Sequence, residues 1–331
     1  MKNIFKNKKI LVTGGTGSFG QEFVKTLCKN FNFKKLAIFS RDELKQFEME
    51  EKLKDNRLRF LLGDLRDYDR VKFALSDIDF VIHAAALKQV PKAEYNPSEY
   101  IKTNIIGSEN IIKASIETNV NKVLSLSTDK AASPINLYGA TKLVADKLFT
   151  AANNMVGSKN IIFSTVRYGN VINSRGSVIP FFKQQISQNK PLPITHNEAT
   201  RFFLSLNQGV NFVIESFKIM KGGEIFIPKI PSFNIRELAD CMSQKSKKKI
   251  IGLRPGEKIH EVLISKDEGN VYEYKNFYVI APSIIMDKSK NYKSYFMEKG
   301  RQLKIDFEYS SNLNSKFLNK INLKKYIKKF I

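Results

Sequence analysis

Apolar residues occur in short runs through the first 170 residues, and longer segments with helical spacing separate these runs. The runs cover residues 9–13, 36–40, 58–62, 80–84, 123–127 and 161–167, and the segments between them cover 19–28, 42–53, 66–75, 97–118 and 137–152. Apolar runs of this length are typical of strands buried on both faces of a parallel sheet. Repeated strand–helix units predict an α/β protein with a doubly wound parallel Rossmann sheet.

The regular pattern loosens after Asn170. Glycine or proline interrupts it at positions 176, 180, 191, 193, 222, 223, 228 and 231. We expect a nucleotide-binding Rossmann domain at 1–175, with a later return segment near 200–225. A smaller C-terminal substrate-binding lobe is expected mainly at 176–290. A basic tail at 291–331 contains a helical patch at 318–331, and the sequence leaves the role of this tail open.

The composition is that of a globular protein without a membrane span. The chain has 331 residues, of which 42% are hydrophobic, and no apolar stretch approaches the length needed to cross a bilayer. The N-terminal segment has no apolar core of the kind found in secretory signal peptides. The two cysteines, Cys28 and Cys241, cannot form a disulfide framework. We therefore expect a cytoplasmic protein.

The net charge of +23 suggests nucleic acid or an anionic surface as a partner. However, lysines are scattered along the whole chain, arginines are few, and no stretch clusters arginine with aromatic residues. The densest basic cluster, at 324–329, is typical of a solvated helix end. The sequence therefore favours a lysine-rich composition, and anionic small ligands, over a nucleic-acid partner.

A glycine-rich sequence at 13–20, Thr-Gly-Gly-Thr-Gly-Ser-Phe-Gly, joins the first predicted strand to the first predicted helix. Glycines at 14, 17 and 20 permit a tight turn and a close approach of the backbone to a pyrophosphate at the helix N-terminus. In this structural context the motif predicts a dinucleotide site. Its expected cofactor-binding residues are Thr13, Gly14, Gly17, Ser18, Phe19 and Gly20.

The end of the second predicted strand selects the cofactor. An acidic residue there would bind the ribose 2′-hydroxyl of NAD. Here the strand ends in Ser40 and Arg41, which can hold a 2′-phosphate, and Asp42 is expected to cap the next helix. This arrangement favours NADP over NAD. Further cofactor contacts are expected from Lys45, Asp64, Leu65, Ala84, Ala85, Ala86, Lys88 and Asn104, with Asp64 and Leu65 beside the adenine.

Two acid–base pairs follow the fifth predicted strand. Tyr138 and Lys142 are four residues apart and share one face of a helix, so an ammonium can stabilise the tyrosine phenolate. Asp129 and Lys130 stand at the end of the strand. One pair can oxidise an alcohol, and two pairs can also eliminate water. Taken singly, Asp129 could be a helix cap and Lys130 a solvated lysine; their joint position favours catalysis.

Seven motifs together resemble one family. They are KQVP at 88–91, AEYNP at 93–97, STDKAA at 127–132, NLYGATK at 136–142, RYGNV at 167–171, SRGS at 174–177 and RPGEK at 254–258. These motifs are similar to those of the inverting UDP-N-acetylglucosamine 4,6-dehydratases of pseudaminic acid synthesis. This family lies within the extended short-chain dehydrogenase/reductase superfamily. The resemblance covers roughly residues 5–285 and leaves out the basic tail.

The resemblance implies conversion of UDP-N-acetylglucosamine to UDP-2-acetamido-2,6-dideoxy-β-L-arabino-hex-4-ulose. Tyr138, assisted by Lys142, would take the proton of the sugar C4 hydroxyl, and Thr128 would hydrogen-bond the C4 oxygen. Lys130, where retaining relatives carry glutamate, would remove the C5 proton, and protonated Asp129 would protonate the leaving C6 hydroxyl. A lysine can act as this base only if burial or a cationic neighbour such as Lys142 lowers its pKa.

The same resemblance places a UDP-sugar in the second lobe. Arginine grips phosphate bidentately, so Arg175 and Arg254 are the expected diphosphate partners, although a loop salt bridge would also explain Arg254. Arg201 is either structural or part of the nucleotide site. The full set of expected substrate-binding residues is Lys88, Lys130, Asn170, Val171, Arg175, Arg201, Arg254 and Glu257, and no metal site is expected.

Two other functions remain open from the sequence alone. The first is a sugar-nucleotide epimerase or a retaining 4,6-dehydratase on the same fold, against which Lys130 argues. The second is a non-catalytic protein that binds NADP or nucleic acid, against which the intact acid–base pairs argue. Assembly as a homo-oligomer is expected from the family resemblance only.

Overall fold

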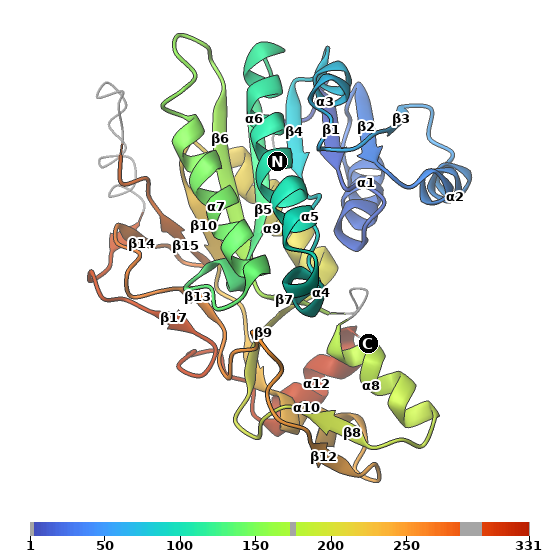
Figure 1. Cartoon of the computed structure of the whole chain (residues 1–331), viewed down its shortest axis with the longest axis vertical. Coiled ribbons are helices and arrows are strands. Elements are labelled where there is room, and N and C mark those ends of the chain that lie inside the picture. Colours follow the sequence, from blue (N-terminus) through green and yellow to red (C-terminus); the bar gives the residue numbers. More distant parts are fainter. Residues whose placement is uncertain (1–2, 173–176, 285–299, 331) are drawn as a thin grey trace.

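Ten strands form one twisted sheet within residues 3–172, 177–284 and 300–330, which are the residues that the computed structural model describes (Figure 1). Seven neighbouring strands are parallel, in the order β3, β2, β1, β4, β5, β6, β10. Their bounds are β3 (Leu58–Leu62), β2 (Lys35–Ser40), β1 (Lys9–Thr13), β4 (Phe80–His83), β5 (Lys122–Thr128), β6 (Ile162–Tyr168) and β10 (Ile225–Pro228).

The strand order reverses between β1 and β4. The chain moves outward from β1 through β2 to β3 and then returns to β4 on the other side of β1, which it pairs from Ile10–Phe80 to Thr13–His83. In open parallel sheets, the crevice at such a reversal is where ligands bind. The predicted Rossmann sheet is therefore confirmed, and its topology places the site at the carboxyl ends of β1, β4 and β5.

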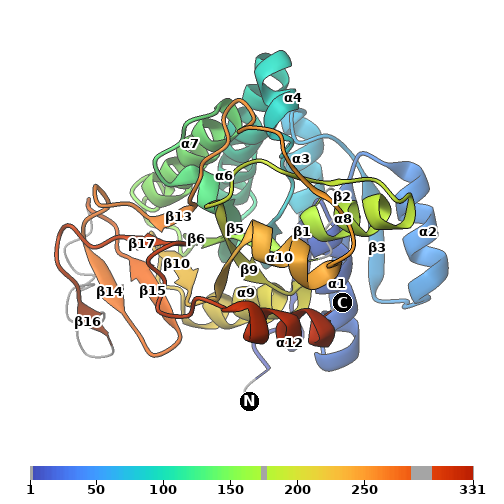
Figure 2. The ribbon, with the colours of Figure 1, turned by 90° about the horizontal axis from the view of Figure 1, so that it is seen from below.

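Helices cover both faces of the sheet because alternate residues of each strand point to opposite faces (Figure 2). Ile10 and Val12 of β1 pack in one buried cluster with α1 and α9, whereas Leu11 packs in another with α3, α6 and α7. The helices of the first half are α1 (Ser18–Asn30), α2 (Glu43–Leu53), α3 (Tyr68–Leu75), α4 (Val90–Tyr95), α5 (Pro97–Tyr100), α6 (Gly107–Glu117) and α7 (Leu137–Ala152).

The predicted elements of the first half are mostly confirmed. Strands β1 and β3 and helix α7 have the predicted bounds, and most other ends differ by one or two residues. The predicted helix at 97–118 was wrong in detail, because residues Ile101–Ile106 form a π-helical segment, η1, between α5 and α6. Helix α4 was not predicted; Pro91 stands in its first turn, where a missing backbone N–H costs little.

The main sheet continues beyond the part expected from the sequence. Antiparallel strands β15 (Phe277–Ile280), β14 (Val271–Glu273) and β16 (Arg301–Gln302) extend it past β10. The residues of β10, β14 and β15 lie in the range assigned to the second lobe, and β16 lies in the tail. These strands are two to four residues long, too short for a clear apolar pattern. Helix α9 (Leu206–Ile219), in the expected return segment, packs beside α1 on one face.

A second lobe lies below the carboxyl ends of the parallel strands in Figure 1. Its buried cluster includes Phe182, Leu238 and Leu323. Leu323 belongs to α12 in the basic tail, so this helix packs on the second lobe. The lobe and its connections contain β7 (Asn170–Val171), β8 (Leu192–Ile194), β9 (Thr200–Leu204), β11 (Ser232–Asn234), β12 (Lys248–Ile250), β13 (Val262–Ile264), β17 (Tyr309–Ser310), α8 (Val178–Ser187), α10 (Ile235–Met242) and α12 (Lys320–Phe330). Among the described residues, no helix is sufficiently long and apolar to span a membrane.

Candidate active site

A cavity of about 1140 Å³ lies between the sheet and the second lobe. Its walls come from the loops after β1, β2, β3, β4 and β5 and from segments of the second lobe. The predicted site residues that line it are Gly14, Gly17, Ser18, Phe19, Gly20, Ser40, Arg41, Asp42, Lys45, Asp64, Leu65, Ala84, Ala85, Ala86, Lys88, Thr128, Asp129, Lys130, Tyr138, Lys142, Asn170, Val171, Arg201, Arg254 and Glu257. One continuous cavity therefore joins the predicted cofactor and substrate residues.

Two predicted residues that the structure describes, Thr13 and Asn104, do not line this cavity. Thr13 is buried beneath it, where its hydroxyl accepts hydrogen bonds from the amides of Ala84 and Ala85 at 3.1 and 3.2 Å. Asn104 is also buried; its side chain hydrogen-bonds both the N–H and the C=O of Leu87. Both side chains thus support the loop after β4. Arg175 lies outside the described residues.

The glycine loop fits a pyrophosphate. Gly14 has a φ of +65°, and a Cβ there would stand 2.8 Å from the Cα of Ala85, so only glycine fits. Gly17 caps α1 without a side-chain hydrogen bond, and the first turn of α1 carries no acidic residue. Neither a cap side chain nor a carboxylate therefore competes for the N–H groups that a phosphate needs.

The residues after β2 leave a basic side chain at the cavity wall. Asp42 accepts a hydrogen bond from the amide of Lys45 at 3.0 Å, so it caps α2 as predicted. The Ser40 hydroxyl accepts from Gln46 at 2.9 Å. The Arg41 side chain is 49% exposed, and its guanidinium is 3.5 Å from Asp64. Arg41 can therefore reorient toward an anion that enters the cavity.

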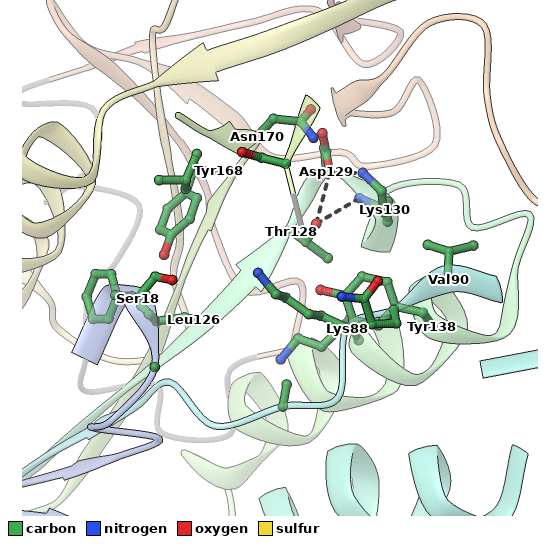
Figure 3. Close-up of a pocket in the computed structure, with 18 of the residues that line it drawn as sticks. Ser18, Lys88, Val90, Leu126, Thr128, Asp129, Lys130, Tyr138, Tyr168 and Asn170 are labelled. Carbon is green, nitrogen blue, oxygen red and sulfur yellow. Dashed lines mark hydrogen bonds and ion pairs between the residues drawn. The ribbon is translucent and has the colours of Figure 1, made fainter. Parts of the chain in front are cut away.

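Three consecutive residues after β5 form a compact hydrogen-bonded group (Figure 3). Asp129 Oδ1 accepts from the Thr128 hydroxyl at 2.9 Å and from Lys130 Nζ at 3.0 Å. A short 3₁₀ turn, η2 (Asp129–Ala131), gives the chain this conformation, and Thr128 caps it. Asp129 is buried, and its Oδ2 has no hydrogen-bond partner among the described residues. One carboxylate oxygen is thus held while the other remains available.

Tyr138 is brought to this group by the first turn of α7. The Asn136 side chain caps α7 by accepting from the amide of Gly139 at 2.8 Å. A Cβ on Gly139 would stand 2.2 Å from the carbonyl oxygen of Lys130, so the glycine allows η2 and α7 to meet. Lys142, one turn further along α7, is also buried. The two predicted acid–base pairs therefore share one wall of the cavity.

Burial dominates the electrostatics of Tyr138 and Lys142. It raises the pKa of Tyr138 to about 12, against a smaller opposing effect of the Lys130 ammonium. Burial also lowers the pKa of Lys142, and Asp146 opposes that change. The sequence prediction that Lys142 brings the pKa of Tyr138 closer to neutrality is thus wrong. The cation that lowers it is Lys130, and desolvation outweighs that cation.

A lowered pKa, the condition stated above for Lys130 to act as a base, is not found in the structure. Burial alone would lower it, but the carboxylates of Asp129 and Glu261 outweigh burial and raise the pKa of Lys130 above its ordinary value. Burial raises the pKa of Asp129, and Lys130 opposes that shift. Lys130 is therefore an ammonium ion in the resting site, held by two acidic neighbours.

Glu261 is a site residue that the sequence analysis missed. It lines the cavity, is 3% exposed, and places Oε1 at 3.3 Å from Lys130 Nζ. It stands just before β13, three residues beyond the RPGEK motif. Its position next to the turn that follows β5 therefore arises only from the tertiary fold. No periodicity or local spacing distinguishes it from a surface glutamate.

The arginine and glutamate of the predicted nucleotide site contact each other. Arg201 donates to Glu257 Oε1 at 2.8 Å and to the backbone carbonyls of Thr200 and Ile259. Its Nε lies 3.5 Å from Glu261 Oε1. Arg201 therefore orients two acidic side chains of the wall. Arg254 lines the cavity, and its backbone N–H donates to Glu257 Oε2 at 3.2 Å.

A second group of charged residues is buried behind Lys142. Arg167 is fully buried and pairs with Asp146 at 3.1 Å and with Glu268 at 2.8 Å. The Ser127 hydroxyl donates to the same Asp146 oxygen at 2.8 Å. These contacts connect β5, β6 and α7 with the loop after β13, so they fix the helix that carries Tyr138 and Lys142.

The chain is similar to known proteins over most of its length. Residues 10–282 match the family model described as polysaccharide biosynthesis protein. An inverting UDP-N-acetylglucosamine 4,6-dehydratase from Campylobacter jejuni is 52% identical over 97% of both chains. A UDP-glucose 4-epimerase from Rickettsia bellii is 42% identical over 96% of this chain and 94% of the relative.

A solved structure matches almost the whole chain. The X-ray structure of Pen from Bacillus thuringiensis superposes with a TM-score of 0.89 at 39% identity and covers 98% of each chain. The fold and these matches agree. The chain belongs to the polysaccharide biosynthesis protein family and, within it, to the group that contains the inverting UDP-N-acetylglucosamine 4,6-dehydratases.

Proposed function

We propose that this protein is a lyase that removes water from UDP-N-acetylglucosamine across C5 and C6 and inverts C5. The product is UDP-2-acetamido-2,6-dideoxy-β-L-arabino-hex-4-ulose, the first intermediate of pseudaminic acid synthesis. The observation that carries the proposal is the Asp129–Lys130 pair beside Tyr138 in one cavity. The 52% identity to the Campylobacter jejuni enzyme supports the same reaction.

The cofactor proposed is NADP. The loop at Gly14–Gly20 and the start of α1 would hold its pyrophosphate, and Arg41 with Ser40 would hold the 2′-phosphate. Asp42 supports this choice because it is engaged as the cap of α2. When bound, NADP would supply a hydride acceptor for sugar C4 and a hydride donor for C6, so the overall reaction would be redox-neutral.

Tyr138 is proposed to remove the proton of the C4 hydroxyl. Because burial raises the pKa of Tyr138, positive charge near the phenol is needed to favour the loss of its proton. The buried Lys142 lies one helical turn along α7 from Tyr138, and the ammonium of Lys130 acts on the phenol from η2. These two cations can stabilise the phenolate. Thr128 would donate to the C4 oxygen.

Asp129 and Lys130 are proposed to eliminate water with one shared proton. At rest, the Lys130 ammonium donates a hydrogen bond of 3.0 Å to the Asp129 carboxylate. Transfer of that proton to Asp129 creates a neutral amine and a carboxylic acid together. The amine then takes the C5 proton, the C5=C6 bond forms, and the C6–O bond breaks as Asp129 protonates the leaving hydroxyl. The ion pair is thereby restored, and C5 is later reprotonated from the opposite face.

The substrate is proposed to bind between the sheet and the second lobe. Arg254, Asn170 and Val171 line that side of the cavity and would contact the UDP group or the sugar. In this division, the Rossmann sheet holds the cofactor and the second lobe holds the nucleotide of the substrate. We also propose a cytoplasmic location and homo-oligomeric assembly, which rest on the low cysteine content and on the family resemblance.

Identifying the product that the protein forms from UDP-N-acetylglucosamine in D₂O tests this proposal. We expect a 4-keto-6-deoxy sugar with one deuterium at C5 and the L-arabino configuration, identified by NMR. A product with retained configuration at C5 would indicate a retaining dehydratase.

An epimerase is the second candidate, because relatives at 42% identity are named UDP-glucose 4-epimerase. Incubation with UDP-glucose separates the two: conversion to UDP-galactose without loss of water would favour the epimerase. The NADP assignment is tested separately, by titrating NADP and NAD against the same protein.

A further inference from the structure

Glu261 holds a buried position opposite Asp129. Lys130 Nζ lies between the two carboxylates, 3.0 Å from Asp129 Oδ1 and 3.3 Å from Glu261 Oε1. The two acidic side chains are 1% and 4% exposed. Each has one oxygen without a hydrogen-bond partner among the described residues. An acidic residue with this burial and this contact affects the proton equilibrium of Lys130 directly.

Among the groups around Lys130, Glu261 is the acidic one, besides Asp129, that can shift the proton equilibrium of Lys130. Arg201, in β9, places its Nε 3.5 Å from Glu261 Oε1 and thereby holds the Glu261 carboxylate in position. The Lys258 ammonium donates a hydrogen bond to the carbonyl oxygen of Ala132 at 2.7 Å. The charged or titratable groups that face the pair are Asp129 in η2, Tyr138 in α7, Arg201 in β9 and Lys258 before β13.

We propose that Glu261 is a positioning residue for the elimination: its carboxylate orients the Lys130 ammonium against Asp129 and sets the pH range in which this pair can act. The proposal rests on the function proposed above for Asp129 and Lys130. Glu261 neither gains nor loses a proton in the reaction. Its charge acts on the two groups that do.

The direction of the effect follows from the charge. The active pair holds one proton, whereas the pair with two protons is inactive at low pH and the pair with none is inactive at high pH. A negative neighbour favours the proton-bound forms, so Glu261 moves both transitions to higher pH. It lies against Lys130, and therefore the transition at high pH should depend on it most.

The first test is the pH dependence of kcat in wild type, Glu261→Gln and Glu261→Asp. For Glu261→Gln, both limbs of the profile should move to lower pH, and each pH unit of movement changes the rate on a limb about tenfold. Glu261→Asp keeps the charge but withdraws it by one methylene, so a smaller movement in the same direction is expected. Glu215→Gln is the matched control, because Glu215 is 59% exposed and pairs only with Lys218 among the described residues.

A purely structural role would lower kcat but leave both limbs in place, and that result would overturn the proposal. Glu261→Asp keeps the test available if Glu261→Gln does not fold, which circular dichroism would reveal.

The second test does not need turnover. Acetic anhydride modifies only neutral amines, and peptide mass spectrometry gives the fraction of Lys130 modified at each pH. The reagent can reach Lys130 because this side chain lines the cavity and is 22% exposed. Lys130 of Glu261→Gln should become reactive at lower pH than Lys130 of wild type. Identical labelling curves would refute the role of Glu261, whereas a wild type that labels as expected but leaves UDP-N-acetylglucosamine unchanged would refute only the proposed function.

Discussion

The carbonyl oxygen of Lys130 and the Cα of Gly139 are so close that a Cβ on Gly139 would stand 2.2 Å from that oxygen. This contact joins the turn that carries Asp129 and Lys130 to the helix that carries Tyr138. The distance between the two acid–base pairs therefore depends on a missing side chain.

Gly139→Ala should separate the two pairs. The methyl group must push η2 away from α7, because the atom it meets belongs to the backbone. We expect a loss of about 1–3 kcal/mol in the free energy of unfolding and a fall in turnover that exceeds the loss of folded protein. Urea denaturation and kcat measure the two effects. Gly269→Ala is the control, because no atom lies within 4 Å of a Cβ placed there.

Tyr138→Phe should remove turnover and leave the cofactor bound. The substitution deletes one hydroxyl from a buried ring, so the cavity wall keeps its shape. Loss of a general base predicts a fall in kcat of about 10²–10⁴-fold, while the affinity for NADP, measured by calorimetry, should change little. Tyr95→Phe is a suitable control, since Tyr95 is 85% exposed. Undiminished turnover in Tyr138→Phe would mean that another group removes the C4 proton.

Arg41→Ala should reduce the preference for NADP. If Arg41 contacts the 2′-phosphate, its loss removes a charge-assisted hydrogen bond, for which about 1.5–3 kcal/mol is typical. NADP should then bind roughly 10- to 100-fold more weakly, and NAD should bind almost as before. Calorimetric titration of both cofactors measures this difference. Equal losses for NADP and NAD would assign Arg41 to a part that both cofactors share, such as the adenosine.

The parts of the site that the sequence predicted are those held together by local spacing. The glycine loop, the Asp42 cap, and the pair of Tyr138 and Lys142 each lie within a few residues of one turn or helix. Glu261 was missed and the role of Arg201 was left open; both residues reach the same cavity from segments more than 70 residues beyond Lys130. Their roles follow from how the second lobe packs on the sheet, and no periodic pattern records that packing.

Proton states were the other part that sequence reasoning could not give. The sequence required a lowered pKa for Lys130 to act as a base and offered Lys142 as a cationic neighbour, but the carboxylates of Asp129 and Glu261 raise the pKa of Lys130. The short edge strands were missed for a comparable reason. Strands of two to four residues are stabilised by pairing with a sheet that already exists, and their own sequences carry little signal.

His83 should make the protein less stable in mild acid. It is fully buried below the loop after β4, where Nδ1 lies 2.9 Å from the Thr13 hydroxyl and Nε2 lies 3.3 Å from that of Ser108. Because Thr13 accepts from two backbone amides, its hydroxyl proton points to Nδ1, and the neutral ring donates from Nε2. Burial, with a smaller effect of Lys142, lowers the pKa of His83 to about 3.

The sign of the pH dependence follows from the two pKa values. Between the folded value of about 3 and the ordinary value of 6.5, the unfolded chain binds a proton at His83 that the folded chain does not. The contribution of His83 is therefore present above pH 6.5 and is lost as the pH falls toward 3, by about 1.4 kcal/mol per pH unit. Urea denaturation at pH 7.5 and pH 5.5 should show a smaller difference between the two pH values for His83→Gln than for wild type. Equal differences in the two proteins would show that His83 titrates alike in the folded and unfolded states.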